Sequence, residues 1–290
     1  MLLTKNLFFL DMKISKARIK KKFFKKESTG KMPELPEVET LCHQLKQIIL
    51  HQVIHDIKII DPKLTMINDA IGKNVKDVIR RGKALEIHLD NGKVLAIHLR
   101  MTGRLEWQDD GRELPIHTRF TIDFKQGRLV CIDPRRFATF SICSRYPYEV
   151  LMEDPLRSFP AEKISKTACN RKLPVKSLLM DQKTILGIGN IYACEILYKA
   201  AVNPRRPSCS LSLHEWKHIE KATRKILKRA VVCRGTTVSD WRDLFGQRGE
   251  YQHELKVYAR AGKRCERCRD IIRRERLNGR GTFFCPSCQT

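Results

Sequence analysis

The chain has 290 residues, of which 57 are Lys or Arg and 32 are Asp or Glu, so its formal net charge is +25. A charge of this size argues against an ordinary enzyme for neutral metabolites and predicts a polyanionic partner, with nucleic acid ahead of an anionic membrane surface. The length suffices for about two domains with a sizeable core, and no apolar run approaches the roughly 20 residues of a membrane span. The eleven cysteines, four of them close to the C-terminus, are typical of a reducing cytosol rather than of a secreted disulfide scaffold.

Residues 1–31 differ in composition from the rest of the chain. They contain ten basic residues against Asp11 and Glu27, while the remainder still carries 47 basic and 30 acidic residues. The segment lacks the apolar core of a secretory signal and the Arg/Ser bias of an organelle presequence. We expect residues 1–32 to be a basic extension that is disordered or absent from the mature protein. A nucleic-acid-binding arm is a second interpretation.

Residues 32–40, with the sequence MPELPEVET, resemble the start of a protein inside a longer reading frame. An initiator methionine is usually removed before proline, which would leave Pro33 with a free secondary amine. Such an amine is a nucleophile, and the neighbouring Glu34 could transfer a proton. The simpler interpretation is a helix start, because Pro36 suits a first turn and Glu37 suits the positive end of the helix dipole. The stretch alone leaves both interpretations open.

The periodicity after Pro36 predicts one amphipathic helix over residues 36–50. Asn91-Gly92 and Gln126-Gly127 lie between apolar runs and predict hairpins. An antiparallel sandwich or barrel is therefore expected in this half of the chain. Its strands are predicted from short β-branched runs at residues 53–60, 75–79, 84–89, 94–99, 119–124 and 129–132.

The second half of the chain reads as mainly helical after a proline-containing linker over residues 146–158. Residues 175–180 and 190–200 have helical periodicity, and a glycine turn lies between them. Residues 211–234 form a long basic amphipathic pattern that starts near Ser212. Short strands are expected around the four C-terminal cysteines.

The most specific local signal is Cys265-x2-Cys268, followed after sixteen residues by Cys285-x2-Cys288. Two such pairs supply four thiolates for a structural zinc site, and four cysteine ligands leave no open position for a catalytic water. Arginines between the pairs give the predicted zinc ribbon a cationic edge, which favours nucleic acid as its partner. These arginines are Arg273, Arg274, Arg276 and Arg280.

Gly187-Ile188-Gly189-Asn190 resembles half of a dinucleotide fingerprint, but it lacks the third glycine and a preceding strand, so a Rossmann fold is excluded. The turn could present backbone N–H groups to a phosphate. A packing turn between two helices explains the same spacing equally well.

Asp133-Pro134-Arg135-Arg136-Phe137 places two guanidinium groups beside an aromatic ring at the end of a strand. Arginines bind phosphates, and an apolar side chain such as Phe137 or Met101 can wedge between bases. Packing within a loop or core is the alternative for each of these residues alone. Lys83 follows Arg80-Arg81-Gly82 and would ordinarily be a solvated turn lysine.

Taken together, the chain from Met32 onward resembles the bacterial formamidopyrimidine-DNA glycosylases. The resemblance rests on the four-cysteine ribbon and on five further motifs in the same order: PELPEVET, RRGK, HLRMTGRL, DPRRF and the VK…LMDQ…GIGNIYACE block. It implies an α+β multidomain fold, with an N-terminal antiparallel β-sandwich and flanking helix, a helix–two-turn–helix domain and a C-terminal zinc ribbon. The corresponding domains are 33–145, 159–255 and 256–290.

The resemblance also implies roles for individual residues. Pro33 would be the nucleophile at C1′ of the damaged nucleotide and Glu34 the proton donor, with Glu37 a second acidic residue in the pocket. Lys83 would act in elimination and phosphate binding, and Arg280 would contact phosphate and serve as an acid in δ-elimination.

Further positions match the DNA contacts of the family. Met101, Arg135 and Phe137 would fill the gap left by a flipped-out base, and a loop near residues 242–254 would cap that base. The remaining expected DNA contacts are His117, Arg136, Arg171, Lys176 and Asn190.

The expected function is base-excision repair by a bifunctional glycosylase and AP lyase for oxidised purines. The partner is double-stranded DNA with oxidised bases, and the expected protein is a monomer of the bacterial cytoplasm with one structural zinc ion. One alternative is an endonuclease VIII-like enzyme for oxidised pyrimidines. Another is a non-catalytic zinc-ribbon DNA-binding protein, if residues 1–32 are retained and Pro33 is an amide.

Overall fold

The computed structural model describes residues 32–65, 67–109, 111–144 and 153–290. The predicted basic extension up to residue 31 lies outside the described residues, and residues 31–290 form one compact unit. Within the described part of the chain, none of the helices combines the length and apolarity needed to cross a membrane.

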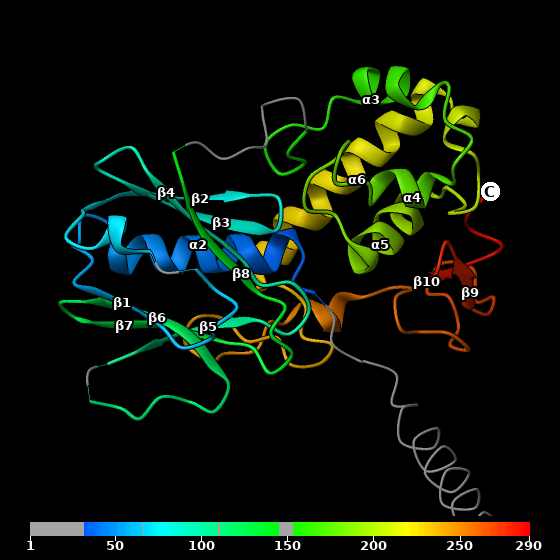
Figure 1. The fold of residues 1–290 in the computed structure, drawn as a ribbon. Coiled ribbons are helices and arrows are strands. Elements are labelled where there is room, and N and C mark those ends of the chain that lie inside the picture. The colour runs from blue at the N-terminus through cyan, green and yellow to red at the C-terminus, as the bar shows by residue number, and fades with distance from the viewer. Residues whose placement is uncertain (1–31, 66, 110, 145–152) are drawn as a thin grey trace, which may run out of the picture. The chain divides into compact units, whose positions relative to one another are not determined.

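The N-terminal half is a sandwich of two four-stranded antiparallel sheets with one long helix, α2 (Leu35–Ile49), running along them (Figure 1). The first sheet has the order β1 (Asp56–Ile59), β6 (Thr118–Phe124), β7 (Gly127–Ile132) and β5 (Arg104–Gln108). The second has the order β2 (Val75–Arg81), β3 (Ala84–Leu89), β4 (Val94–His98) and β8 (Thr139–Cys143).

The predicted helix, hairpins and six strands are present, and two further strands were not predicted. β5 and β8 are both edge strands, so each pairs with a neighbour on one side only. The edge strands β1 and β2 lie in apolar runs, whereas β5 and β8 each have only two large apolar residues, and β8 buries only Phe140 of its five residues. Side chains of both sheets and of α2, among them Leu41, Leu45 and Phe120, share one core.

Four helices and two of the three short 3₁₀ turns lie in the second half of the described chain. Ser212 caps the longest helix, because its hydroxyl accepts the Glu215 N–H while the Glu215 carboxylate accepts the Ser212 N–H. The helices are α3 (Ala161–Ala168), α4 (Val175–Leu179), α5 (Asn190–Ala200) and α6 (Leu213–Val232). The 3₁₀ turns are η1 (Asn68–Ala70), which lies in the sandwich half, η2 (Ser208–Ser210) and η3 (Tyr251–Glu254).

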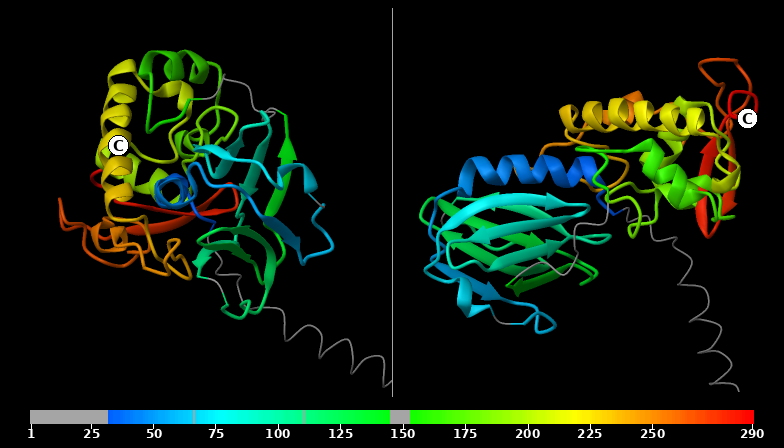
Figure 2. Two further views of the ribbon diagram at one scale, coloured as in Figure 1. Left: turned by 90° about the vertical axis from the view of Figure 1, so that its left-hand side faces the viewer. Right: turned by 90° about the horizontal axis from the view of Figure 1, so that it is seen from above.

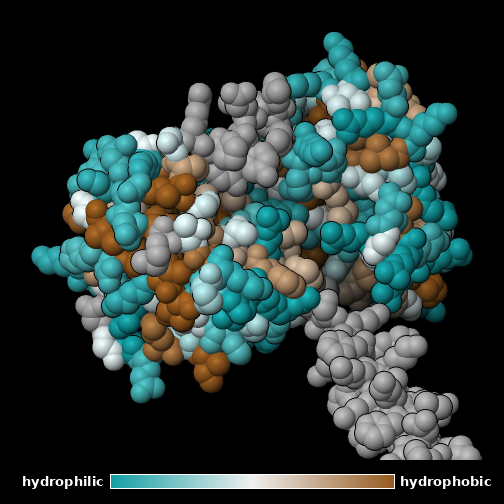
Figure 3. All heavy atoms as spheres, viewed as in Figure 1, coloured by the Kyte–Doolittle hydropathy of each residue, from teal (hydrophilic) through white to brown (hydrophobic). Residues whose placement is uncertain are grey.

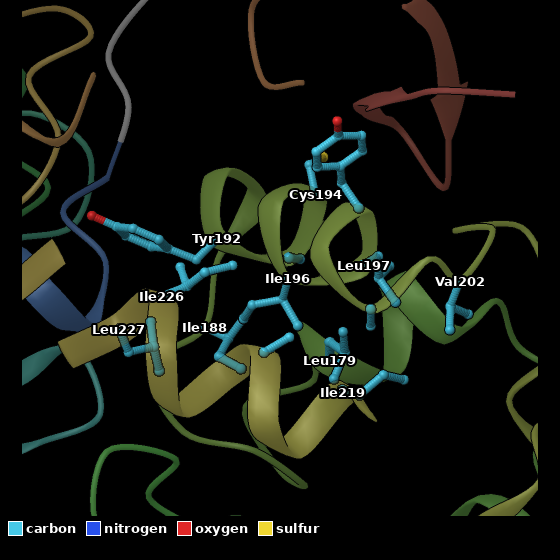
Figure 4. Close-up of a cluster of buried hydrophobic side chains, with 14 of the residues drawn as sticks. Leu179, Ile188, Tyr192, Cys194, Ile196, Leu197, Val202, Ile219, Ile226 and Leu227 are labelled. Atoms are coloured by element: carbon cyan, nitrogen blue, oxygen red, sulfur yellow. The ribbon is translucent and has the colours of Figure 1, made fainter. Parts of the chain in front are cut away.

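A second hydrophobic core lies between α5 and α6 (Figure 4). Ile196, Ile219 and Leu227 fill it, whereas the hydroxyl of Tyr192 points away from it, toward the start of α2. The core therefore orients one polar group toward the N-terminal segment.

The C-terminal ribbon is a two-stranded hairpin of β9 (Arg273–Leu277) and β10 (Arg280–Phe284), as predicted. Asn278 and Gly279 both have positive φ, 46° and 75°, which is the backbone of a type I′ turn. Figure 2 shows this hairpin at the end of the chain beside the helical part. The turn sets the register that pairs Arg280 with Leu277.

The described end of the predicted linker, residues 153–158, is held by contacts with both halves. Glu153 forms an isolated parallel β-bridge with Ile185, and Asp154 accepts two hydrogen bonds from the buried guanidinium of Arg80.

The face seen in Figure 3 is mostly hydrophilic, and its larger hydrophobic areas lie over the sandwich.

Candidate active site and nucleic-acid interface

Glu34, directly before α2, is buried at the first turn of α5. Its carboxylate accepts hydrogen bonds from the N–H groups of Gly189 (2.8 Å), Ile191 (2.9 Å) and Tyr192 (3.3 Å). The first turn of a helix has free N–H groups and a positive dipole end, so it is a good site for a carboxylate. A Cβ at Gly189 would lie 2.3 Å from the Glu34 carboxyl carbon, so only glycine fits there. These N–H groups therefore bind a carboxylate of the protein itself, which neither sequence interpretation of the turn had anticipated.

Glu37, the third residue of α2, also has a carboxylate that accepts hydrogen bonds from three groups. It accepts hydrogen bonds from the Glu34 N–H (2.8 Å), the Tyr192 hydroxyl (2.7 Å) and the Thr236 N–H (2.6 Å). Gly235 has φ +80°, and a Cβ there would lie 2.6 Å from a Glu37 oxygen. The segment after α6 thus closes over the N-terminal segment by backbone contact.

Burial controls the protonation of this cluster. It raises the pKa of Glu34, although the charge of Lys83 opposes the shift. Burial and the charge of Glu34 raise the pKa of Glu37 to about 7. Burial lowers the pKa of Lys83, and the nearby Arg280 acts in the same direction. A carboxyl that keeps its proton and an amine that releases one are the properties of acid–base catalysts.

Pro33 is buried and lines a cavity of about 320 Å³. Met101 and His117, two predicted DNA contacts, line the same cavity from the sandwich, and Asp240 and Trp241 line it from the segment after α6. The proposed nucleophile is thus next to an open space bordered by loops from both halves of the chain.

The DPRRF loop is organised by a residue that the sequence did not single out. Asp133 is fully buried and accepts the N–H groups of Arg135 (3.1 Å), Phe137 (2.6 Å) and Ala138 (2.7 Å). Thr102 also donates its hydroxyl to Asp133, which ties the Met101 turn to this loop. The Phe137 ring is 43% exposed, with the Arg135 guanidinium 4.6 Å from its centre.

Two other predicted DNA contacts are paired with carboxylates. Arg136 binds the buried Asp61 through two nitrogens, and this contact lowers the pKa of Asp61 to about 2. Arg171 donates to Asp181 (3.1 Å) and to the Thr184 hydroxyl (3.1 Å). Both arginine side chains remain partly exposed, by 35% for Arg136 and 39% for Arg171.

Lys176 and Asn190 join the helices to the ribbon. The buried Lys176 ammonium donates to Asn190 (2.6 Å), the Gly281 carbonyl (3.2 Å) and the Thr282 hydroxyl (2.8 Å). Asn190 also donates to the Gly281 carbonyl (2.9 Å). Arg280 is exposed next to this junction. Lys176 therefore positions β10, and through it Arg280, relative to the start of α5.

The loop expected to cap the base is held against the sandwich. Gln44 of α2 donates to Asp243 (2.9 Å) and accepts the Leu244 N–H (3.0 Å), and the Trp107 N–H donates to the Leu244 carbonyl (2.9 Å). Leu244 and Trp241 are part of the sandwich core.

The four ribbon cysteines gather at one point. Their sulfurs all lie within 4.8 Å of one another, with 3.8 Å between Cys265 and Cys288 and 3.4 Å between Cys268 and Cys285. Sulfurs at about 2.3 Å from a tetrahedral zinc ion lie roughly 3.8 Å apart. The cluster therefore fits a four-thiolate zinc site.

Comparisons with known proteins cover nearly all of the described chain. Residues 32–140 match the family model for the formamidopyrimidine-DNA glycosylase N-terminal domain, 151–241 the H2TH domain of the same enzymes, and 262–290 the zinc finger found in FPG and IleRS. The formamidopyrimidine-DNA glycosylase of Carboxydothermus hydrogenoformans is 38% identical over 266 residues, which are 89% of this chain and 100% of the relative. The chain belongs to the formamidopyrimidine-DNA glycosylase family.

Solved structures of this glycosylase family share the fold. A variant of the Lactococcus lactis enzyme in complex with DNA containing Fapy-dG has a TM-score of 0.83 and 29% identity, and the match covers 89% of this chain and 100% of that one. The wild-type L. lactis enzyme with DNA containing an oxidised pyrimidine has a TM-score of 0.82, 29% identity and the same coverage. The zinc-finger match and the cysteine cluster together support a structural zinc ion.

Substituting one ligand tests the metal site. We expect Cys285→Ser to lose zinc and to bind a lesion duplex roughly tenfold more weakly or worse, because such ribbons fold around their metal. Cys209→Ser, at an exposed cysteine outside the cluster, is the matched control. Metal content by mass spectrometry and equilibrium DNA binding measure both effects; unchanged binding by a zinc-free Cys285→Ser protein would contradict the structural role.

Several residues of this candidate site carry no functional signal in the sequence. The sequence marks Asp133 only as the start of a motif and Tyr192 only as part of a helical pattern. Gly235-Thr236, at the end of α6, carries a usable signal, since a glycine after a long helix commonly takes positive φ. Nothing local predicts that the following N–H binds Glu37.

Proposed function

We propose that this protein is a bifunctional DNA glycosylase and AP lyase that removes oxidised purines, such as 8-oxoguanine and formamidopyrimidines, from duplex DNA. The observation that carries the proposal is the cluster at the start of α2. The buried Glu34 has a raised pKa, adjoins Pro33 and is electrostatically coupled to Lys83. Family membership and the lesion-containing complexes of relatives give further support.

In this mechanism the free amine of Pro33 attacks C1′, and the bond between C1′ and the damaged base breaks. Glu34 supplies the proton that opens the sugar, leaving an iminium between Pro33 and C1′. The iminium acidifies the C2′ hydrogen, and loss of that proton expels the 3′ phosphate. A second elimination expels the 5′ phosphate, with Lys83 and Arg280 binding phosphate and assisting proton transfer.

Access to C1′ requires the base to leave the stack, at a cost of a few kcal/mol. Met101, Arg135 and Phe137 are proposed to fill the resulting gap and so offset that cost. The rigid Asp133 turn supports this role, because it holds an exposed aromatic ring in a fixed position.

The remaining interface is proposed to bind the DNA backbone. His117 borders the cavity, and Arg136 and Arg171 are partly exposed for contact with phosphates while their carboxylate partners orient them. Lys176 and Asn190 act at the junction with the ribbon. We propose that the protein works as a monomer on duplex DNA in the bacterial cytoplasm, a reducing compartment that suits a chain in which none of the eleven cysteines, all of them described, forms a disulfide.

A second candidate is a preference for oxidised pyrimidines, since an L. lactis relative has been seen with DNA containing such a lesion. Incision of matched duplexes separates the two. We expect protein beginning at Pro33 to cut 8-oxoguanine and formamidopyrimidine duplexes faster than an oxidised-pyrimidine duplex of the same sequence. The reverse order would support the second candidate, and no incision of any of them would refute both.

A further inference from the structure

The longest helix carries a row of cations on its outward side. Trp216, Ile219 and Leu227 face inward and pack in the helical core. Both views of Figure 2 show α6 along the outer edge of the helical part. The exposed Lys and Arg residues of this helix are referred to below as the α6 basic face. They are Lys217, Lys221, Arg224, Lys225, Lys228 and Arg229.

The spacing of this face is regular. Lys217, Lys221, Lys225 and Arg229 follow one another at steps of four residues, which places them about 6 Å apart along the axis and about 18 Å from end to end. Arg224 and Lys228, also four residues apart, form a second row beside them. The face therefore presents an extended line of positive charge rather than a single point.

Half of the α6 basic face is not neutralised by the protein. Lys221, Lys225 and Lys228 form no ion pair with any described residue, whereas the other three each have a carboxylate partner. Exposed side chains of one sign repel one another when no counter-charge is built in. The unpaired lysines therefore leave a surface that a polyanion would stabilise.

The positive charge continues onto neighbouring elements. Lys199 and Arg267 line a cavity of about 290 Å³ together with Lys225 and Arg229, and three glutamates also line it. Burial lowers the pKa of Lys199, and the charges of Lys225, Arg267 and Lys221 act in the same direction. Arg267 is held in place, because it donates to the Tyr198 carbonyl (2.8 Å) and its guanidinium lies 4.2 Å from the Tyr198 ring centre.

This surface is separate from the catalytic cluster. The inward side of α6 packs on α5 and α2, the two elements that hold Glu34 and Glu37. The residues that line the Pro33 cavity include none of α6, so the cavity and the α6 basic face share no residue.

We propose that the α6 basic face is a second binding surface for the phosphate backbone of duplex DNA, used while another segment occupies the lesion site. Duplex DNA fits it because a line of cations about 18 Å long matches a rod with one negative charge per roughly 1.7 Å. Few aromatic or hydrogen-bonding groups accompany the lysines, so binding would depend on the phosphate charge and not on the base sequence of the DNA.

Protein beginning at Pro33 is first saturated with a duplex of about 15 base pairs, roughly one and a half turns, that carries a non-cleavable abasic analogue. Binding of a second, fluorescent, undamaged duplex is then measured by anisotropy. We expect this binding to weaken at least about 40-fold between 50 and 200 mM salt, the effect of three phosphate contacts. The variant has glutamine at three positions: Lys221→Gln, Lys225→Gln and Lys228→Gln. The control removes the same charge from the sandwich: Lys73→Gln, Lys76→Gln and Lys125→Gln.

The proposal predicts that the affinity for the second duplex falls at least tenfold in the α6 variant and less than twofold in the control. Both proteins should incise the short lesion duplex at the wild-type rate, so a failure here leaves the proposed repair activity untouched. Equal effects of the two variants, or no binding of a second duplex by wild-type protein, would overturn the proposal of a second DNA-binding surface. Tighter binding of a polyglutamate peptide of equal charge would overturn the assignment to DNA in favour of an acidic protein.

Discussion

Protein that begins at Pro33 should be trapped by borohydride as a covalent adduct with an 8-oxoguanine duplex, whereas the chain that retains residues 1–32 should give none. In the longer chain the Pro33 nitrogen is part of a peptide bond, and resonance with the carbonyl removes its nucleophilicity. The expected difference is between nearly complete trapping and the background of the assay. Gel separation of labelled DNA from the adduct measures it.

The matched control adds a single alanine before Pro33. This keeps a free amine but displaces it by about 3.8 Å, the distance between neighbouring Cα atoms, so trapping should still be lost. An adduct of equal yield from the extended chain would show that another amine, such as that of Lys83, is the nucleophile.

Glu34→Gln should lower the rate of base excision by about 10²–10⁴, the usual contribution of a general acid. Cleavage of a pre-formed abasic site should fall less, because no base has to be expelled. Single-turnover kinetics on the two substrates separate these effects. Glu195→Gln is the control for folding, since Glu195 is also a buried carboxylate held by three backbone N–H groups, those of Lys256, Val257 and Tyr258.

The pH profile provides a second measurement of the same role. Burial raises the pKa of Glu34, so the acid form persists to higher pH than for an exposed glutamate. Excision should therefore fall as the pH rises through that raised pKa, when the proton is lost. Glu34→Gln should lack this falling limb, and a limb of unchanged position in the variant would assign it to another group.

Local signals in the chain were sufficient for much of the fold. The helix after Pro36, the hairpins at Asn91-Gly92 and Gln126-Gly127 and the capped start of α6 follow from periodicity and turn chemistry within a few residues. The zinc site follows from the spacing of its cysteines, because two close pairs need only one hairpin to meet. The strands β5 and β8 were missed because each has only two large apolar residues, Leu105 and Trp107 in β5 and Phe140 and Ile142 in β8.

The proposed catalytic cluster is of a different kind, because its physical properties arise from contacts between segments that are distant in the sequence. By sequence alone, Pro33 and Glu34 could be no more than a helix start, and motif resemblance suggested a role without a geometry. The tertiary structure brings Glu34 to backbone N–H groups 155 residues further along the chain, and it buries Lys83 beside the same carboxylate. Burial and the helix end then determine where the proton resides. Composition, spacing and motif order thus established a zinc-ribbon protein resembling DNA glycosylases. Only the contact of Glu34 with the first turn of α5 decided that the residue after Pro33 is a buried acid, because backbone N–H groups at a helix start are free to bind it.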